Sequence, residues 1–389
     1  MQLSRMATGM PDLSPLFEPL TVRGVTLRNR VVMSPMTRYF SPGGIPTDDV
    51  AAYYARRAAG GAGLIITEGV GIHDPAAIDD ANIPVMHGDA ARAGWRKVVD
   101  RVHEAGGIIF PQLWHMGPML KRGVGPHPNT EPRRPSGVWG PIGSHVVWGL
   151  DPEQLRVAQV AGPEMSRADI RQVLDAYAEA ARMAKEVGFD GIAIHGAHGY
   201  LPDAFLWSGT NLRQDEYGRD IQGRTLFVRQ LVAAIRAAIG EELPIMLRFS
   251  QWKQQDYTAK IAGGPDELEQ LLLPISAAGV DIFDASTRRF HEPEFAGSSL
   301  NLAGWTQRIT GKPTMTVGSI GLNKDLYQGF QEGDVGLVDL EPVIDRFNQG
   351  EFSLVGVGRA MLCNPDFARR IRQNEKLRPY EAKFVMQLI

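Results

Sequence analysis

Two histidines separated by two residues stand in the segment AIHGAHGYLPDAFL, which runs from Ala193 to Leu206, and a tyrosine follows them. These residues are His195, His198 and Tyr200. Imidazole and phenol groups at this spacing are able to bind a metal ion, to exchange protons, or to hold a substrate by hydrogen bonds. Ordinary hydrogen-bonded or packed side chains are the remaining interpretation.

The pattern favours hydrogen-bond donors over metal ligands. A catalytic zinc ion needs three protein ligands and an open position, and no HExxH run supports such a site. A neutral imidazole N–H that points at a carbonyl oxygen stabilises the negative charge that develops there. We therefore expect His195 and His198 to bind one carbonyl oxygen and Tyr200 to deliver a proton from the same turn. No metal site is expected.

Glycine-rich turns follow the last two apolar runs of the chain, in TVGSIG (Thr316 to Gly321) and VGVGRAM (Val355 to Met361). Glycines let backbone N–H groups approach an anion, and an arginine forms a forked pair with it. The turns therefore predict a phosphate site with Arg359 as its cation, and tight turns without a ligand are the alternative. The second run is not a dinucleotide fingerprint, because Met361 stands where the third glycine belongs.

Polar side chains also end the other apolar runs. They are Thr37, Glu68, Gln112, Trp114, His195, His198, Tyr200 and Arg248. An amide, a hydroxyl and an arginine beside a phosphate site suit a flat cofactor with a phosphate tail, and flavin mononucleotide (FMN) fits that description. Arg248 stays protonated and would stabilise the reduced, anionic ring. A pair with a carboxylate inside the protein is the alternative for Arg248.

Eight short runs that are apolar on both faces position these residues along the chain. They are Arg30–Met36, Gly63–Gly69, Gly107–His115, Gly191–Gly196, Pro244–Ser250, Val280–Ser286, Pro313–Ser319 and Ser353–Met361. Buried parallel strands have this pattern, and helical patterns separate the runs. The order predicts an α/β fold, a (β/α)₈ TIM barrel in which residues 1–389 form a single domain. A doubly wound sheet is the alternative.

Capping residues mark where the helices begin and end. Ser166 with Asp169 three residues later predicts a capping box, and Gly188 ends the helix that follows. Near the end of the chain, Asn364 and Pro365 predict the N-cap and the first residue of a last helix.

One interval is far too long for a turn. Residues 116–166 are rich in Gly, Pro and Trp and show no helical pattern, so we expect an irregular insertion or lid after the third strand. It leaves the carboxyl end of that strand, the face on which barrel enzymes carry their active sites. A second irregular stretch, Arg288–Asn301, leaves the sixth strand on the same face.

Composition and charge exclude several classes of protein. The chain of 389 residues has 41 Lys and Arg against 44 Asp and Glu, and it shows no basic face, so nucleic acid is not expected as a partner. A single cysteine, Cys363, excludes an internal disulfide and a four-cysteine iron–sulfur site. We expect Cys363 to be a small, partly buried residue without a chemical role. No signal peptide and no run of about 18 apolar residues occurs. We expect a soluble, cytoplasmic protein with no membrane partner.

The chain resembles the old yellow enzymes, which are FMN-dependent ene-reductases that use NADH or NADPH. The resemblance extends from about Phe17 to Arg372, and its segments occur in the family's order. They are LRNRVVMSPMTR, YYARRAAGGAGLIITEG, PQLWHMG, HGAHGYLPDAFL, LRFS, TVGSIG and GVGRAMLCNPDF. The resemblance implies a non-covalently bound FMN and a nicotinamide as electron donor.

Roles for individual residues follow from the resemblance by position. The residues implied to bind FMN are Pro35, Met36, Thr37, Gly69, Gln112, Arg248, Gly318, Ser319, Gly358 and Arg359. The last four of these would hold the phosphate, and Arg248 would lie by the N1–C2 side of the flavin. In the substrate pocket, His195 and His198 would bind the carbonyl, Tyr200 would protonate the α-carbon, and Trp114 would line the wall.

The reaction implied by the resemblance has two halves in one pocket. NAD(P)H reduces the flavin and leaves, and an enone or similar activated alkene then receives a hydride at its β-carbon and a proton from Tyr200 at its α-carbon. Many relatives have Asn in place of His198, and the insertion after PQLWHMG is particular to this chain. Both features adjoin the substrate, so substrate identity stays open, as do NADH against NADPH and monomer against homo-oligomer.

Three other functions remain open at this point. The first is a flavoenzyme of the same architecture that oxidises a substrate, for example by N-demethylating a small amine. The second is a metal-dependent barrel hydrolase that uses the histidines as ligands. The third is a non-catalytic flavin-binding protein.

Overall fold

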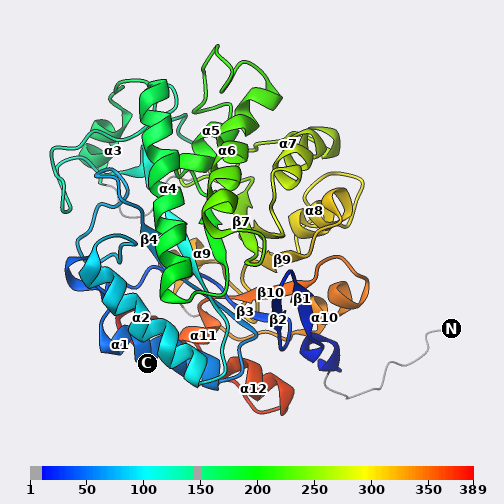
Figure 1. Ribbon diagram of the computed structural model, residues 1–389. Helices are drawn as coiled ribbons and strands as arrows, with labels where there is room; N and C mark the ends of the chain where they lie inside the picture. Colours follow the sequence, from blue (N-terminus) through cyan, green and yellow to red (C-terminus); the bar gives the residue numbers. More distant parts are fainter. Residues whose placement is uncertain (1–10, 144–150, 334) are drawn as a thin grey trace.

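The computed structural model describes residues 11–143, 151–333 and 335–389. Eight parallel strands close into a barrel in the order β10-β3-β4-β5-β6-β7-β8-β9 (Figure 1). They are β3 (Val31–Met33), β4 (Leu64–Gly71), β5 (Ile109–Trp114), β6 (Ile192–His195), β7 (Ile245–Ser250), β8 (Ile282–Ser286), β9 (Thr314–Val317) and β10 (Leu354–Val357). Each strand falls on one of the eight apolar runs, and the predicted (β/α)₈ barrel is confirmed.

Helices cover the outside of the barrel. The longer ones are α1 (Asp48–Ala59), α2 (Asp89–Glu104), α4 (Arg167–Val187), α6 (Ile221–Ile239), α7 (Pro265–Ala277) and α8 (Leu302–Thr310). The shorter ones are α3 (Pro152–Gln159), α5 (Leu201–Leu206), α9 (Leu326–Glu332), α10 (Glu341–Asn348), α11 (Ala360–Cys363) and α12 (Phe367–Arg372). Single 3₁₀ turns are η1 (Ser14–Phe17), η2 (Pro42–Gly44), η3 (Gly117–Met119) and η4 (Ala382–Met386).

The local rules that predicted α4 operate in the structure. Ser166 accepts a hydrogen bond from the Asp169 amide, and the Asp169 side chain accepts one from the Ser166 amide, so the capping box is complete. Gly188 ends the helix with φ 98°, a left-handed conformation that glycine adopts without steric cost. Ile170, Val173 and other apolar residues on one face of α4 are fully buried, because this face packs on the barrel.

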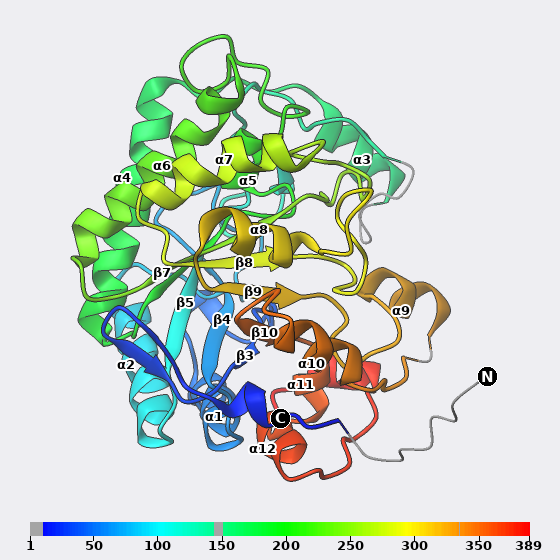
Figure 2. The same cartoon turned by 90° about the vertical axis from the view of Figure 1, so that its right-hand side faces the viewer.

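A hairpin of β1 (Leu20–Val22) and β2 (Val25–Leu27) closes the amino end of the barrel. Val22 and Leu27 pack with inward-facing residues of the barrel strands, such as Val32, Leu64 and Leu354. In Figure 2, β8 and β9 run toward the side on which α3 and α9 lie, and the hairpin lies on the opposite side. The plugged end is therefore unavailable to a ligand, and the carboxyl ends of the strands remain as the functional face.

Three local expectations are wrong. Asn364 does not cap α12, because its side-chain amide donates to the carbonyl oxygens of Ala360 and Arg378, so α12 begins only at Phe367. Residues 360–361 at the end of the last apolar run belong to the short helix α11 and not to a strand. Cys363 is fully buried and not partly exposed.

The predicted insertion is real but not wholly irregular. Helix α3 lies inside residues 116–166, begins with Asp151 and Gln154 in a capping box, and buries no residue of its own. Residues 144–150 of the interval lie outside the described residues. Two arginines tie the described part to the barrel: Arg133 binds Asp74 at 3.2 Å, and Arg213 donates to the Pro135 carbonyl at 2.7 Å. The proposed lid role stays a prediction.

Candidate active site

The barrel register brings most of the predicted residues to one end of the molecule. Across neighbouring strands, Gly69 pairs with Gln112, and His195 pairs with Arg248. Trp114 ends β5, and all these positions lie at or near the carboxyl ends of their strands. Their side chains therefore converge on one face although up to 179 positions separate them in the sequence (69 to 248).

Four aromatic rings form the centre of this site. His195 and His198 lie with ring centroids 5.1 Å apart, almost perpendicular at 85°. The Tyr200 ring is 4.6 Å from His195 and 5.0 Å from Trp114, edge to face in both cases. The predicted catalytic residues and the predicted pocket residue Trp114 are thus brought together as one cluster.

A tight turn after β6 presents the second histidine. His198 has φ 64° and Gly199 has φ 86°, a left-handed conformation that histidine tolerates better than most residues. The Gly199 amide donates to Asp203 at 2.7 Å, and Asp203 forms a fully buried ion pair with Lys253, also at 2.7 Å. A side chain at Gly199 would meet the Gln255 amide oxygen at 2.1 Å, so the loop after β7 packs directly on this turn.

Both imidazoles are uncharged at neutral pH. Burial lowers the pKa of His195 well below its usual range, and the nearby Arg248 cation lowers it further. Burial has the same effect on the pKa of His198, with His195 and Arg248 adding to it. Each ring therefore carries a single N–H and acts as a hydrogen-bond donor without a positive charge.

Tyr200 is held in its protonated form. Burial raises its pKa well above the ordinary value of 10.0, against the opposing effect of a hydrogen bond with the Gln254 side chain. A phenol that keeps its proton in this way is suited to donate it only when a strong base develops beside it.

Several buried polar atoms at this face have no partner within the described part of the chain. They are Gln112 Nε2, Trp114 Nε1, His195 Nδ1, Arg248 Nη2, Glu68 Oε1 and Asp284 Oδ1. Buried polar groups are almost always hydrogen-bonded in native proteins. A set of donors and acceptors left unpaired around one end of a barrel therefore fits a polar, flat ligand such as the flavin ring.

Arg248 both pairs with a carboxylate and keeps a donor for a ligand, which were the two interpretations left open for it. Its Nε atom forms an ion pair with Asp284, the residue beside it on β8, while Nη2 stays unpaired. Asp284 was not predicted. A carboxylate in the middle of the apolar run VDIFDAS is nevertheless a visible signal, and comparison of the polar residues near the ends of the predicted strands would have identified it. The pair orients the guanidinium and leaves one donor edge for a ligand.

The segment after β3 is fixed by a buried carboxylate. Glu68 accepts hydrogen bonds from the amides of Arg38, at 2.8 Å, and of Tyr39. Pro35, Met36 and Thr37 come directly before them and are partly buried. The predicted flavin-edge position Gly69 has no room for a side chain, because a Cβ atom there would lie 2.4 Å from the Trp114 ring.

The two glycine-rich turns also have the shape of an anion site. Gly318 has φ 143° and Ser319 has φ 55°, and neither amide has an acceptor within the residues that the structure describes. Gly358 and Arg359 follow β10, the strand next to β9. Burial lowers the pKa of Arg359, and its guanidinium already donates to the Lys324 carbonyl and lies over Tyr380 at 5.6 Å.

The described part of the chain gives no support to metal binding by the histidines. In residues 11–143, 151–333 and 335–389, no group of three or more His, Cys, Asp or Glu side chains is arranged to hold a metal ion. The described helices also include none that is long and apolar enough to cross a membrane.

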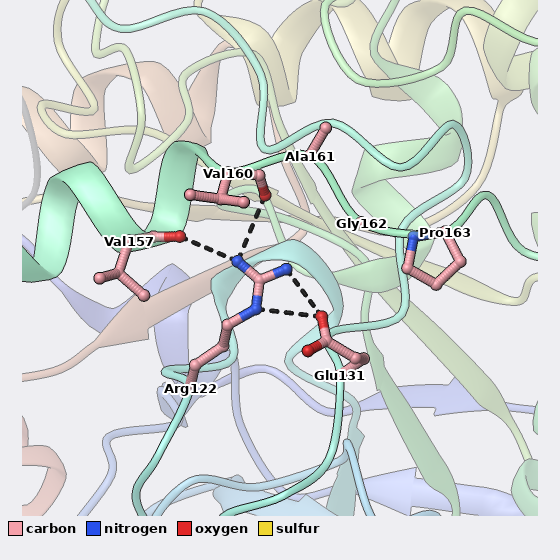
Figure 3. Close-up of a pocket in the computed structure, with 7 residues that line it drawn as sticks. All are labelled: Arg122, Glu131, Val157, Val160, Ala161, Gly162 and Pro163. Carbon is pink, nitrogen blue, oxygen red and sulfur yellow. Dashed lines mark hydrogen bonds and ion pairs between the residues drawn. The ribbon is translucent and has the colours of Figure 1, made fainter.

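Two surface hollows are lined mainly by residues of the insertion. The larger, of about 480 Å³, is lined by Arg122, Glu131 and the end of α3 (Figure 3). Its one cation is already paired, since Arg122 binds Glu131 at 2.7 Å and the Val157 carbonyl at 2.8 Å. The second, of about 270 Å³, lies beside Asp74 and Arg133. Neither contains a residue of the aromatic cluster.

The fold is that of a barrel enzyme, and comparison with known proteins identifies its family. The chain belongs to the NADH:flavin oxidoreductase / NADH oxidase family, whose sequence pattern matches residues 15–378. It is an NAD(P)H:flavin oxidoreductase of the old yellow enzyme family, as the resemblance implied.

Relatives of known name and structure support this assignment. The chain is 30% identical over 377 residues to 12-oxophytodienoate reductase 7 of Oryza sativa subsp. japonica, covering 95% of this chain and 91% of that protein. It is 29% identical to an NADPH dehydrogenase of Clostridium acetobutylicum, covering 95% and 99%. The structure of an old yellow enzyme homologue from Zymomonas mobilis aligns with a TM-score of 0.77 at 28% identity, covering 96% of each chain. Morphinone reductase in complex with tetrahydroNAD aligns with a TM-score of 0.76 at 27% identity, covering 95% and 93%.

Proposed function

We propose that this chain is an FMN-dependent ene-reductase that uses NADH or NADPH and reduces the carbon–carbon double bond of an α,β-unsaturated carbonyl compound. The observation that carries the proposal is the pair of uncharged imidazoles beside a protonated tyrosine. This set supplies two neutral donors and one acid in a single turn, which a carbonyl oxygen and a developing carbanion require.

The unpaired polar atoms support FMN as the cofactor. Gln112 Nε2 and Arg248 Nη2 are donors suited to the oxygen-bearing edge of the flavin, while Thr37 follows β3 and Gly69 lies near the end of β4. The free amides of Gly318 and Ser319 suit the phosphate. FMN held by these residues would supply the hydride chemistry that links the nicotinamide to the β-carbon of the alkene.

The protein's own groups would then act on the substrate. His195 and His198 would donate to the carbonyl oxygen, withdraw electron density from the double bond, and stabilise the enolate-like transition state. Tyr200 would hold its proton until negative charge develops at the α-carbon and would then transfer it there. Trp114 would form a wall of the substrate pocket, since its ring contacts that of Tyr200.

Names of relatives support a carbonyl substrate. Proteins similar to this chain are called 12-oxophytodienoate reductase and morphinone reductase, and both names describe reduction of a compound with a ketone group. The complex of morphinone reductase with tetrahydroNAD supports a nicotinamide as the donor in this chain as well.

An anaerobic absorbance titration of the purified protein tests the proposal. NADPH or NADH is added first, and 2-cyclohexenone follows. We expect a yellow protein that bleaches with the nicotinamide and recovers its colour with the enone. A protein that bleaches but does not recover contradicts ene reduction, and one that bleaches with a small amine instead is an oxidising flavoenzyme. A colourless protein that cannot be reconstituted with FMN contradicts the cofactor.

A further inference from the structure

The ring of His198 is engaged on one side by a residue outside the predicted site. Its Nε2 atom lies 2.8 Å from the hydroxyl oxygen of Ser286, the last residue of β8. The Nδ1 atom has no hydrogen-bond partner in the described part of the chain and is not among the enclosed, unpartnered atoms. Of the two ring nitrogens, Nδ1 is therefore the one open to a ligand.

The direction of the Ser286 hydrogen bond follows from counting protons. A neutral imidazole has one N–H and one bare nitrogen, and a hydroxyl both donates and accepts. Ser286 is buried, 5% exposed, and its hydroxyl has no acceptor other than His198 in the described residues. If Nε2 carried the hydrogen, the serine O–H would be buried without an acceptor, which is costly. The arrangement that satisfies both groups has Ser286 donating to a bare Nε2.

We propose that Ser286 is a positioning residue that holds His198 in the tautomer with the hydrogen on Nδ1, so that this N–H faces the substrate. The inference that the N–H meets a carbonyl rests on the proposed function. The tautomer itself does not, because it follows from contacts within the protein.

The surroundings of the ring keep it in this orientation. Trp252 stacks on His198 at 4.2 Å with an angle of 22° between the planes, and His195 meets it at right angles from another side. Ser250, opposite Ser286 in the β7–β8 register, accepts the His198 amide at 3.0 Å. A ring flip that exchanged Nδ1 and Nε2 would have to break the Ser286 contact within this packing.

His195 presents the complementary nitrogen. Its Nδ1 atom is enclosed, whereas Nε2 is not among the enclosed atoms and has no hydrogen-bond partner in the described residues, so Nε2 is the ring nitrogen open to the substrate. The two donors of the clamp would therefore come from different ring positions, Nε2 of His195 and Nδ1 of His198. Ser286 thus decides whether the second donor exists, since the other tautomer of His198 would present a bare nitrogen to the carbonyl oxygen and repel it.

Nitrogen-15 NMR of the oxidised, FMN-loaded protein labelled at its nine histidines tests the tautomer directly. The His198 signals are assigned by their loss in His198→Gln. We expect a protonated Nδ1 and a bare Nε2 in the unmodified protein, a mixture or reversal in Ser286→Ala, and the original pattern in Ser286→Thr, which keeps the hydroxyl. Ser353→Ala is the matched control, since its hydroxyl bonds Gln307 outside the site. A protonated Nε2 in the unmodified protein, or signals unchanged by Ser286→Ala, overturns the proposal.

Binding of phenol, followed through the flavin absorbance, separates this inference from the proposed function. We expect Ser286→Ala to raise the phenol Kd by about fivefold, with recovery in Ser286→Thr. If His195→Ala weakens phenol binding but Ser286→Ala changes neither the tautomer nor the Kd, the clamp stands and the role of Ser286 is refuted. If the tautomer changes while no variant affects phenol binding, Ser286 acts as proposed and the carbonyl clamp is refuted.

Discussion

Ser250 and Ser286 face each other across the β7–β8 pair, and both hydroxyl groups bind the same histidine. Ser250 accepts the backbone amide of His198, while Ser286 lies against its ring nitrogen. The ends of two adjacent strands thus hold a histidine in the turn after a third strand, β6, so the geometry of the proposed carbonyl clamp depends on the register of β6, β7 and β8.

Replacement of Tyr200 by Phe separates the two half-reactions. We expect reoxidation of the reduced flavin by 2-cyclohexenone to slow by about 10²-fold or more, because the phenolic proton is lost. Reduction by NADPH should stay nearly unchanged. Stopped-flow absorbance measures both steps, and an equal loss in both would show that Tyr200 is not the acid.

The pH dependence of the same step provides a second readout. Burial raises the pKa of Tyr200 well above 10.0, so the proton stays on the phenol as the pH rises through the range in which a free tyrosine begins to ionise. We expect the enone half-reaction to be insensitive to pH up to about 9 as far as this group is concerned. A rate that falls with an apparent pKa between about 8 and 9, and does so only when Tyr200 is present, contradicts this.

Substitutions of the two histidines should differ in severity. His195→Ala removes a buried donor, and we expect phenol binding to weaken by about 1–3 kcal/mol. His198→Asn should cost far less, because asparagine also tolerates the left-handed conformation at this position (φ 64°). Its side-chain amide N–H would stand near the place of the imidazole Nδ1 and face the ligand. Phenol titrations of His195→Ala, His198→Asn and His198→Ala check the order, and a His198→Asn variant as weak as His198→Ala would contradict it.

Glu68 should make the fold less stable as the pH rises. Burial raises its pKa from the ordinary value of 4.5 to about 7, against the opposing hydrogen bonds from the Arg38 and Tyr39 amides. Between these two values the unfolded chain loses the proton and the folded chain keeps it, so the free energy of unfolding falls, by about 3 kcal/mol in all. Below pH 4.5 both the folded and the unfolded chain hold the proton, so this group no longer changes the free energy of unfolding with pH.

The variant Glu68→Gln isolates this contribution. Urea unfolding of the two proteins at a series of pH values measures the difference in their free energies of unfolding, in which all other titrating groups largely cancel. We expect the advantage of the native glutamate over the substituted glutamine to shrink steadily from pH 4.5 to about 7. The exposed Glu104→Gln serves as the control, and a Glu68 difference as flat as that of the control would refute the prediction.

The buried pair of Lys253 and Asp203 should be costly to break from one side. Both side chains are fully enclosed, and removal of one partner of such a pair typically costs about 3–5 kcal/mol, since the other charge stays buried. We therefore expect a loss of this size for Lys253→Met. The double variant Lys253→Met, Asp203→Asn should recover part of it, because the substituted asparagine is uncharged and its side-chain oxygen still accepts the Gly199 amide.

Unfolding in urea measures these losses against an exposed pair. Arg156→Ala breaks the ion pair with Glu153, in which both side chains are 67% exposed, and should change stability by no more than about 0.5 kcal/mol. Phenol binding is followed in parallel, because Asp203 holds the turn of His198. A double variant less stable than Lys253→Met would contradict the assignment of the cost to an unpaired charge.

Much of the fold is determined by short-range patterns. The eight runs that are apolar on both faces predict eight buried parallel strands, because a strand covered on both sides leaves no polar face. The capping box of Ser166 and the left-handed Gly188 depend only on neighbours a few residues away, which is why the bounds of α4 follow from the sequence. Asp151 and Gln154 also form a capping box at the start of α3. This helix was not predicted, because it has no buried apolar face and its sequence therefore shows no helical spacing of apolar residues.

Only the tertiary structure decides which polar groups meet. Asn364 has the chemistry of a helix cap, yet its amide is taken by the carbonyl of Arg378 across 14 residues. Nothing near Arg248 in the sequence indicates that Asp284 pairs with it, and nothing near His198 indicates that Ser286 binds its ring. Asp284 and Ser286 lie on β8, and the register of β6, β7 and β8 sets their distances from Arg248 and His198. The sequence by itself thus determines the elements and the residue types at their ends, whereas hydrogen-bond direction, protonation and orientation in the site depend on the folded barrel, because they arise from contacts between distant segments.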